Sequence, residues 1–127
     1  MNNDKKIMWV LRIAVAGEFF GHGMFGIQGK TDWVRWTQEL LNVDISLATT
    51  IILLVGIMDI LLAIMVLVKP IRPLVLWMAI WGLWTALLRP IVGMPIWDFI
   101  ERFANIGAPL ALLLIKGFPK NLRDFFR

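Results

Sequence analysis

The chain has 127 residues, of which 59% are hydrophobic, and its mean hydropathy is +0.75. Soluble domains usually contain about 45–50% apolar residues, and a chain this short cannot bury a larger apolar share in one water-soluble core. The composition therefore predicts an integral membrane protein. The net charge of +4 does not indicate a nucleic-acid partner, because the basic residues stand at the ends of apolar runs. The lack of cysteine excludes disulfide chemistry and Cys-ligated metal sites.

The apolar segments predict an all-α, single-domain bundle of four transmembrane helices over residues 1–127. Each segment is close to the roughly 20 residues that cross about 30 Å of hydrocarbon. Between the first two, residues 31–41 place Trp33 and Trp36 on one face and predict a short amphipathic helix in the membrane interface. An ordered loop is the alternative for this stretch. The four membrane segments cover about residues 7–27, 45–68, 71–92 and 96–115.

The distribution of Lys and Arg predicts the orientation of the helices. With four spans, the two termini and the turn near residue 70 share one side of the membrane, and most of the basic residues lie there. The positive-inside rule then places both termini in the cytoplasm, and we expect a bacterial cytoplasmic membrane. The first helix should be retained, because Arg12 interrupts the apolar run that a cleaved signal peptide needs. The basic residues on the cytoplasmic side are Lys5, Lys6, Lys69, Arg72, Lys116, Lys120, Arg123 and Arg127.

Several charged side chains lie within the predicted spans, where each costs about 2.5–3.5 kcal/mol unless it is paired, solvated or neutral. Glu18 and the single histidine, His22, are four residues apart and share a helix face, and Asp59 interrupts the most apolar segment. We expect these residues to meet polar residues of the third and fourth segments in one pocket, in the outer half of the bundle. The predicted ligand-binding or proton-handling residues are Glu18, His22, Asp59, Arg89, Glu101, Arg102 and Asn105.

The same polar residues also have purely structural interpretations. Three acids face two arginines in this set, so a proton has to be held somewhere if all of them are buried. Alternatively, Arg89 with Glu101, and Arg102 with a carboxylate, form ion pairs that only fix the helix register, and His22 only donates a hydrogen bond to Glu18 or to a backbone carbonyl. No metal site is expected, because no second histidine stands at ligand spacing.

Two further patterns concern helix faces. Trp77, Trp81 and Trp84 form an aromatic stripe on the third segment, which is either a wall of the pocket or a packing and lipid-facing surface. Gly17 and Gly21 have the spacing of small residues that lets two membrane helices approach closely. We therefore expect another helix to pack against the first one at these two glycines.

The motifs along the chain resemble those of the DoxX/DoxD-like family of small four-helix membrane proteins. The first segment reads "RIAVAGEFFGHGMFGIQG" and is followed by a stretch with two tryptophans; the second contains the buried acid of "GIMDILLAI", where the family more often has Glu; the fourth contains "ERFANIGAPLALLLI". The resemblance covers roughly residues 8–115. It implies a small membrane subunit, in some members linked to quinone oxidoreductases, and it marks as family-like Arg12, His22, Gly23, Asp59 and Asn105.

Two classes of function follow from these observations. In the first, the pocket binds a lipophilic redox ligand such as a quinone, whose carbonyl groups need hydrogen-bond donors and whose reduction needs proton carriers. The chain shows no redox centre and no nucleophile of its own, so its status as an enzyme stays open and electrons would come from a membrane or peripheral partner subunit. In the second class the chain is a small proton, cation or solute carrier, which would need a homo-oligomer, or a non-catalytic structural subunit.

Overall fold

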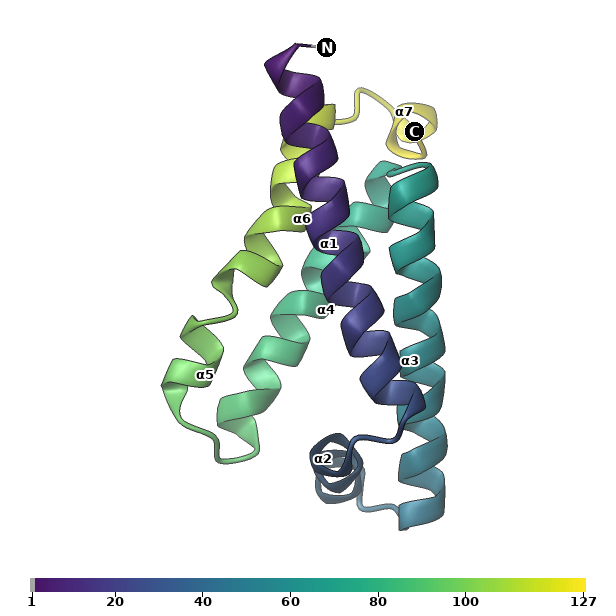
Figure 1. Cartoon of the computed structure of the whole chain (residues 1–127), viewed down its shortest axis with the longest axis vertical. Helices are drawn as coiled ribbons and strands as arrows, with labels where there is room; N and C mark the ends of the chain where they lie inside the picture. Colours follow the sequence, from purple (N-terminus) through teal and green to yellow (C-terminus); the bar gives the residue numbers. More distant parts are fainter. Residues whose placement is uncertain (1) are drawn as a thin grey trace.

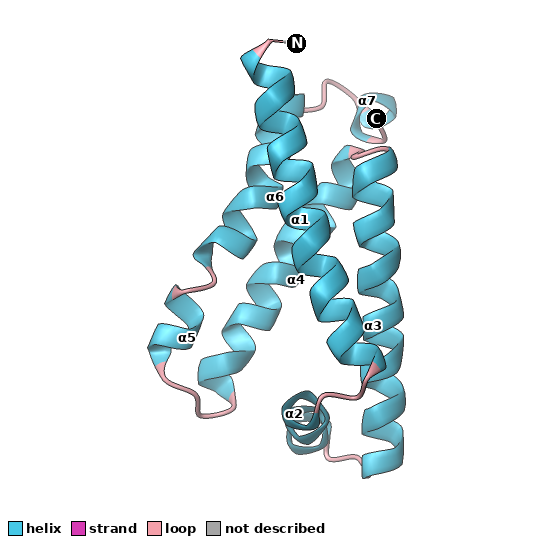
Figure 2. Ribbon diagram, in the orientation of Figure 1, coloured by secondary structure: helices cyan, strands magenta, loops and turns pink. Residues whose placement is uncertain are grey.

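The computed structural model describes residues 2–127 of the chain. These residues form α-helices and no strand, which confirms the predicted all-helical fold (Figures 1 and 2). Three of the helices, α1, α3 and α4, are long and apolar enough to cross a membrane. The chain is thus a helical membrane protein. The helices are α1 (Asn3–Ile27), α2 (Thr31–Leu41), α3 (Ile45–Val68), α4 (Arg72–Ile91), α5 (Ile96–Ile100), α6 (Phe103–Lys116) and α7 (Leu122–Phe125).

The continuous helix expected over residues 96–115 is wrong, because the structure divides this segment into α5 and α6. The helix α5 ends at Ile100 with Glu101 as its C-cap, and the backbone of Arg102 leaves the α-helical region with φ −94° and ψ 7°. The N–H of Asn105 then donates to the carbonyl of Arg102, three residues back instead of four. Hydropathy does not register such a break, since it averages over side chains and carries no information on backbone angles.

The main apolar core lies at one end of the molecule, the end where both chain termini lie (Figure 1), and a smaller apolar cluster of Val34, Ala48 and Ile52 packs α2 against α3. The residues of the main core come from the middle of α1, the second half of α3, the first half of α4 and the second half of α6. The largest side chains at its centre, Met78 and Leu112, are almost completely buried. At the opposite end α3 and α4 share few contacts. The core residues are Val15, Ala16, Phe19, Leu62, Ala63, Val66, Leu74, Val75, Met78 and Leu112.

Two buried arginines bind the carbonyl groups that helices leave free at their C-terminal ends. Arg12 donates from Nε to the carbonyl of Val66 (2.9 Å) and from its guanidinium to the carbonyl of Leu67, both at the end of α3. Arg72 donates to the carbonyls of Lys116, Gly117 and Asp124. A cation at a helix C-terminus also opposes the negative end of the helix dipole. The arginines therefore close the end of the bundle that contains the core.

The helices α1 and α3 approach each other backbone to backbone, at glycines other than the predicted pair. A Cβ atom on Gly56 of α3 would lie 2.6 Å from the carbonyl oxygen of Gly23, and a Cβ on Gly26 would lie 2.7 Å from Cα of Gly56. In residues 2–127 no other helix has an atom within 4 Å of a Cβ built on Gly17 or Gly21, so the expected contact there is wrong. The spacing rule identifies small residues on a helix but not which face the partner helix covers.

Candidate functional site

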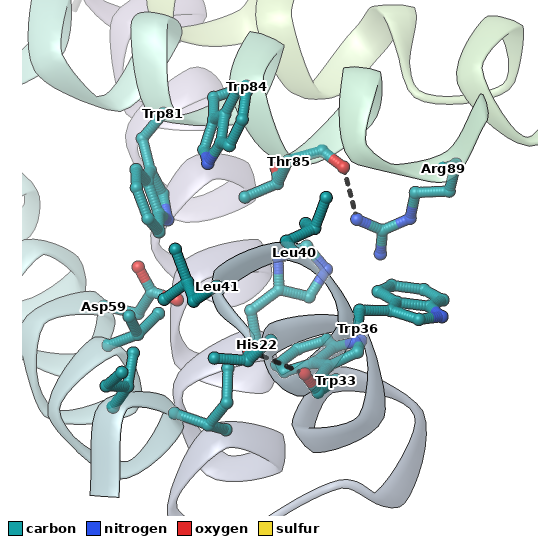
Figure 3. Close-up of a pocket in the computed structure, with 14 residues that line it drawn as sticks. His22, Trp33, Trp36, Leu40, Leu41, Asp59, Trp81, Trp84, Thr85 and Arg89 are labelled. Atoms are coloured by element: carbon teal, nitrogen blue, oxygen red, sulfur yellow. Dashed lines mark hydrogen bonds between the residues drawn. The ribbon is translucent and has the colours of Figure 1, made fainter. Parts of the chain in front are cut away.

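A cavity of about 410 Å³ lies at the end of the bundle opposite the core, between α1, α2, α3 and α4 (Figure 3). Its volume falls in the range of about 300–1,000 Å³ that small-molecule sites usually have. Aliphatic side chains and four indole rings form most of its wall. A few polar side chains point into it: an imidazole, a carboxylate, two threonine hydroxyls and a guanidinium. An apolar enclosure with few polar groups is the usual form of a ligand site.

Some of the residues predicted for the site line this cavity and others do not. Those that line it are His22, Asp59, Arg89, Trp81 and Trp84. Glu101 and Arg102 instead line a second, smaller cavity of about 140 Å³ next to it, together with Arg89. The residues predicted for the site that line neither cavity are Glu18, Asn105 and Trp77.

The three residues outside the cavities have other surroundings. Glu18 is half-buried on α1, within electrostatic range of Arg102 and Asp59. Asn105 lies where α6 crosses α4, and its carbonyl oxygen is 3.0 Å from the position of a Cβ on Gly82. The ring of Trp77 stacks on the ring of Trp81 at 5.7 Å and is largely exposed, so the aromatic stripe on α4 divides into cavity wall and outer surface.

Asp59 is the deepest polar group of the cavity. Its exposed fraction is 3%, and its Oδ1 atom has no hydrogen-bond partner in residues 2–127. It stands in α3, on the same helix face as Gly56 and Ala63, which are both buried against the other helices. The carboxyl group lies beneath the indole of Trp81 at the edge of the cavity (Figure 3). A buried polar atom without a partner indicates a group whose partner is a ligand or water.

Arg89 lies on the opposite side of the cavity from Asp59 (Figure 3). Its exposed fraction is 6%; it donates to the carbonyl of Thr85 on its own helix, and its guanidinium carbon is 5.2 Å from the centre of the Trp36 ring. No carboxylate of residues 2–127 lies within 4.0 Å of it, so the alternative of a structural ion pair with Glu101 is wrong. The break between α5 and α6 leaves Glu101 exposed.

His22 faces the tryptophans of α2. Its ring meets the ring of Trp33 edge to face, with centroids 5.8 Å apart and an interplanar angle of 83°. The side-chain hydrogen bonds of the described chain do not include one between His22 and Glu18, although one helical turn separates the two residues. The imidazole is therefore held by aromatic packing, and its nitrogen atoms are available to a group in the cavity.

The sequence prediction missed the contribution of α2 to the cavity. Trp33, Trp36, Thr37 and Leu40 of this helix all line it, and Trp36 is buried. The spacing of Trp33 and Trp36 predicts one apolar face, but nothing in the sequence places that face anywhere except in the membrane interface. In the structure α2 packs against α3 and covers the cavity. The hydroxyl group of Thr37 donates to the carbonyl of Trp33 (2.8 Å), and that of Thr85 donates to the carbonyl of Gly82 (3.1 Å).

The arrangement suits a flat, mostly apolar molecule with a hydrogen-bonding group at each end. Arg89 donates at one end at any physiological pH, because a guanidinium stays protonated. Asp59 donates at the other end when protonated and accepts when ionised. Indole rings between the two ends favour an aromatic or quinonoid ring over an aliphatic one.

Comparisons of the chain with protein-family models, with curated proteins and with solved structures gave no match. The resemblance to the DoxX/DoxD-like family thus stays a prediction from its motifs.

Proposed function

We propose that the chain is a four-span membrane protein with both termini in the cytoplasm and a ligand cavity in the outer half of the bundle. In this proposal α5 and α6 together make the fourth crossing, and α2 lies in the outer interface. The support is the charge distribution: the end with the termini carries eight Lys and Arg residues, and the apolar outer surfaces of α1, α3 and α4 have lengths that suit a bilayer.

The ligand that fits this cavity best is a quinone, and the protein acts as a quinone-linked or accessory subunit of a membrane oxidoreductase. The observation that carries the proposal is the buried Oδ1 of Asp59, which has no hydrogen-bond partner among residues 2–127 and belongs to an indole-walled cavity with Arg89 at its other end. Arg89 would donate to one quinone carbonyl, and Asp59 or His22 would exchange protons at the other. A bound quinone would supply two-electron, two-proton chemistry, with electrons delivered by a partner protein.

The quinone content of the purified protein tests this proposal. The protein is isolated from its native membranes in mild detergent and extracted with organic solvent, and quinone per chain is measured by mass spectrometry. We expect a ratio near one, a loss of at least about tenfold in Asp59→Asn and Arg89→Gln, and no change in Arg35→Gln. Arg35 is the matched control because it is exposed on the outer face of α2, where it pairs with Asp32 at 3.2 Å.

A quinone content no higher than that of an unrelated four-helix membrane protein would overturn the proposal. The buried carboxylate of Asp59 would then favour the second candidate, a proton or cation carrier, since an inward-facing acid is the usual group of such pathways. Proton flux into liposomes that contain the wild-type protein, but not those with Asp59→Asn, would identify that carrier. A lack of proton flux with both the wild type and Asp59→Asn would indicate that the chain is a structural subunit.

A further inference from the structure

The chain after α6 lies against the end of the bundle that contains the core, and Arg72 holds it there. The guanidinium of Arg72 donates to the carbonyls of Lys116 (2.6 Å), Gly117 (2.8 Å) and Asp124 (2.7 Å). The short helix α7 is thereby fixed next to the start of α4 (Figure 1). We call residues 117–127 the C-terminal segment.

The contacts of Arg72 place the C-terminal segment level with the ends of the apolar helices. The helix α3 ends at Val68, whose side chain is largely exposed, and the charged Lys69 follows it. The helix α4 begins at Arg72 itself. A change from exposed apolar residues to charged residues marks the surface of the membrane, so the C-terminal segment lies at that surface.

Three large apolar side chains of the C-terminal segment have little cover in residues 2–127. The exposed fractions of Phe118, Leu122 and Phe126 are 80%, 75% and 57%. Within α7, Asp124 and Phe125 are less exposed, so this helix turns one face to the bundle and the other outward. Apolar side chains at this level of a membrane protein insert into the lipid interface, because leaving them in water is unfavourable.

Positive charge is concentrated at the same end of the bundle. With the buried Arg12 included, this end has nine Lys and Arg residues and two acids, Asp4 and Asp124, whereas the rest of the chain has seven acids and four Lys or Arg residues. The carboxylate of Asp124 lies 3.5 Å from Arg72 and so offsets little of the charge at the surface. An excess of positive charge beside exposed apolar side chains is complementary to anionic lipid headgroups. The exposed cations of the C-terminal segment are Lys120, Arg123 and Arg127.

We propose that the C-terminal segment lies in the membrane surface and binds anionic phospholipids. Phe118, Leu122 and Phe126 insert between the acyl chains, and the exposed cations bind the phosphate groups of the lipid. A protein partner fits this segment less well, because each of these apolar side chains has a Lys or Arg within two residues, and charged residues are depleted at the centre of protein interfaces. The proposal requires only that the apolar helices cross a membrane, so it does not depend on the quinone site.

Fluorescence quenching in lipid nanodiscs tests where the C-terminal segment lies. The chain has no cysteine, so an NBD fluorophore can be attached to Leu122→Cys alone, and Phe118→Cys repeats the measurement outside α7. The nanodiscs contain phosphatidylcholine and phosphatidylglycerol. We expect a nitroxide on the lipid acyl chains to quench the label at position 122. Iodide in the water should quench it at least about threefold less than a label on Asn3→Cys.

Asn3 is the control because it lies beyond the membrane surface. Arg12 donates to the carbonyl of Val66, which fixes the level of Arg12 near the end of α3. From Arg12 back to Asn3 the helix α1 continues for about 13 Å at roughly 1.5 Å per residue, and Asn3 is exposed. A label at this position should be open to iodide and out of reach of the nitroxide.

Nitroxide-labelled lipids of two kinds test the preference for anionic headgroups. Phosphatidylglycerol and phosphatidylcholine that carry the same nitroxide are compared at equal mole fraction. We expect the phosphatidylglycerol to quench at least about twofold more strongly, because each Lys or Arg near the surface attracts anionic lipid, and high salt to remove the difference. The triple variant Lys120→Gln, Arg123→Gln and Arg127→Gln should also remove it. Arg35→Gln should not, because Arg35 lies on α2 at the opposite end of the bundle.

Three results would overturn the proposal. Strong iodide quenching of the labels at positions 118 and 122 would place the C-terminal segment in water. Protection from both iodide and the nitroxide would show that protein, such as a second copy of the chain, covers the segment. Equal quenching by the two labelled lipids would refute the preference for anionic headgroups. The expected quenching in a protein that contains no quinone would support this proposal while the quinone proposal fails.

Discussion

Three arginines are buried, two at the end of the bundle that contains the core and one beside the cavity, and their partners differ between the two places. Arg12 and Arg72 satisfy backbone carbonyls at helix ends, whereas Arg89 has one hydrogen bond to its own helix and faces a cavity. In the sequence Arg12 and Arg89 are single cations within apolar segments, and Arg72 stands at the start of one. The roles of the three arginines differ because Arg12 and Arg72 each lie beside the C-terminal end of another helix, whereas Arg89 does not. Tertiary packing decides which helix end lies beside each arginine.

Asp124 offers a test of how Arg72 holds the C-terminal helix α7. Its carboxylate accepts a hydrogen bond from the N–H of Lys120 (2.9 Å) and lies 3.5 Å from Arg72, and both interactions lower the pKa of Asp124 below its ordinary value of about 4. A lowered pKa in the folded state stabilises α7 docking above pH 4, and this contribution is lost as the pH falls below that value.

Amide chemical shifts of ¹⁵N-labelled protein in micelles would follow this transition. We expect the signals of residues 120–126 to shift as the pH falls below about 4, and Asp124→Asn to abolish this pH dependence. Signals that stay constant in the wild type down to pH 2 would contradict the role of the carboxylate.

The sequence predicts the bounds of a helix correctly where the apolar run is flanked by a capping residue and a proline. The helix α3 covers the residues expected for it, because Asp44 accepts from the N–H of Leu47 at its start and Pro70 follows its end. The prediction of one helix over residues 96–115 is wrong. The mean hydropathy there is high, but the backbone angles change at the charged residues Glu101 and Arg102. A change of that kind depends on the helix packed alongside, which a single sequence does not reveal.

The cavity was predictable to the extent that polar groups in a membrane must face inward. That argument found His22, Asp59 and Arg89. The same argument predicts that all of these residues share one pocket, whereas in the structure they are divided between two cavities and a helix crossing. The depth of a residue in the membrane does not determine which side of its helix it lies on. Trp33 and Trp36 were assigned to the interface because the amphipathic pattern of α2 has the same appearance whether lipid or protein covers it.

The contact of α1 with α3 predicts which glycines tolerate a side chain. Gly56→Ala should lower the free energy of unfolding by about 1–3 kcal/mol or more, because its Cβ meets the backbone of α1, which cannot move aside as a side chain would. Gly17→Ala is the control, since nothing lies within 4 Å of its Cβ and alanine favours the helix. Thermal unfolding followed by circular dichroism in detergent compares the two, and equal midpoints would contradict the backbone contact.

At the scale of the whole molecule, the proposed orientation assigns each end of the bundle to one side of the membrane. The natural chain has no cysteine, so single cysteines can be introduced without background. We expect Glu39→Cys on α2 to react with a membrane-impermeant maleimide in intact cells, and Lys120→Cys to react only after permeabilisation. Both side chains are exposed, which makes their reactivity a measure of sidedness. The reverse labelling pattern would show that the topology is inverted. Labelling of both Glu39→Cys and Lys120→Cys in intact cells would exclude four spans.

The few contacts between α3 and α4 beside the cavity set how a ligand reaches it. Leu41 and Trp84 line the cavity and are exposed on their outer sides, toward the acyl chains in the proposed membrane setting. A ligand that enters the cavity from the lipid, between α3 and α4, arrives by two-dimensional diffusion. The occupancy of the cavity then follows the mole fraction of the ligand in the lipid and not its aqueous concentration. Apparent affinity in detergent will accordingly fall as micelles are added at constant ligand, because the added micelles dilute the ligand in the phase from which it binds.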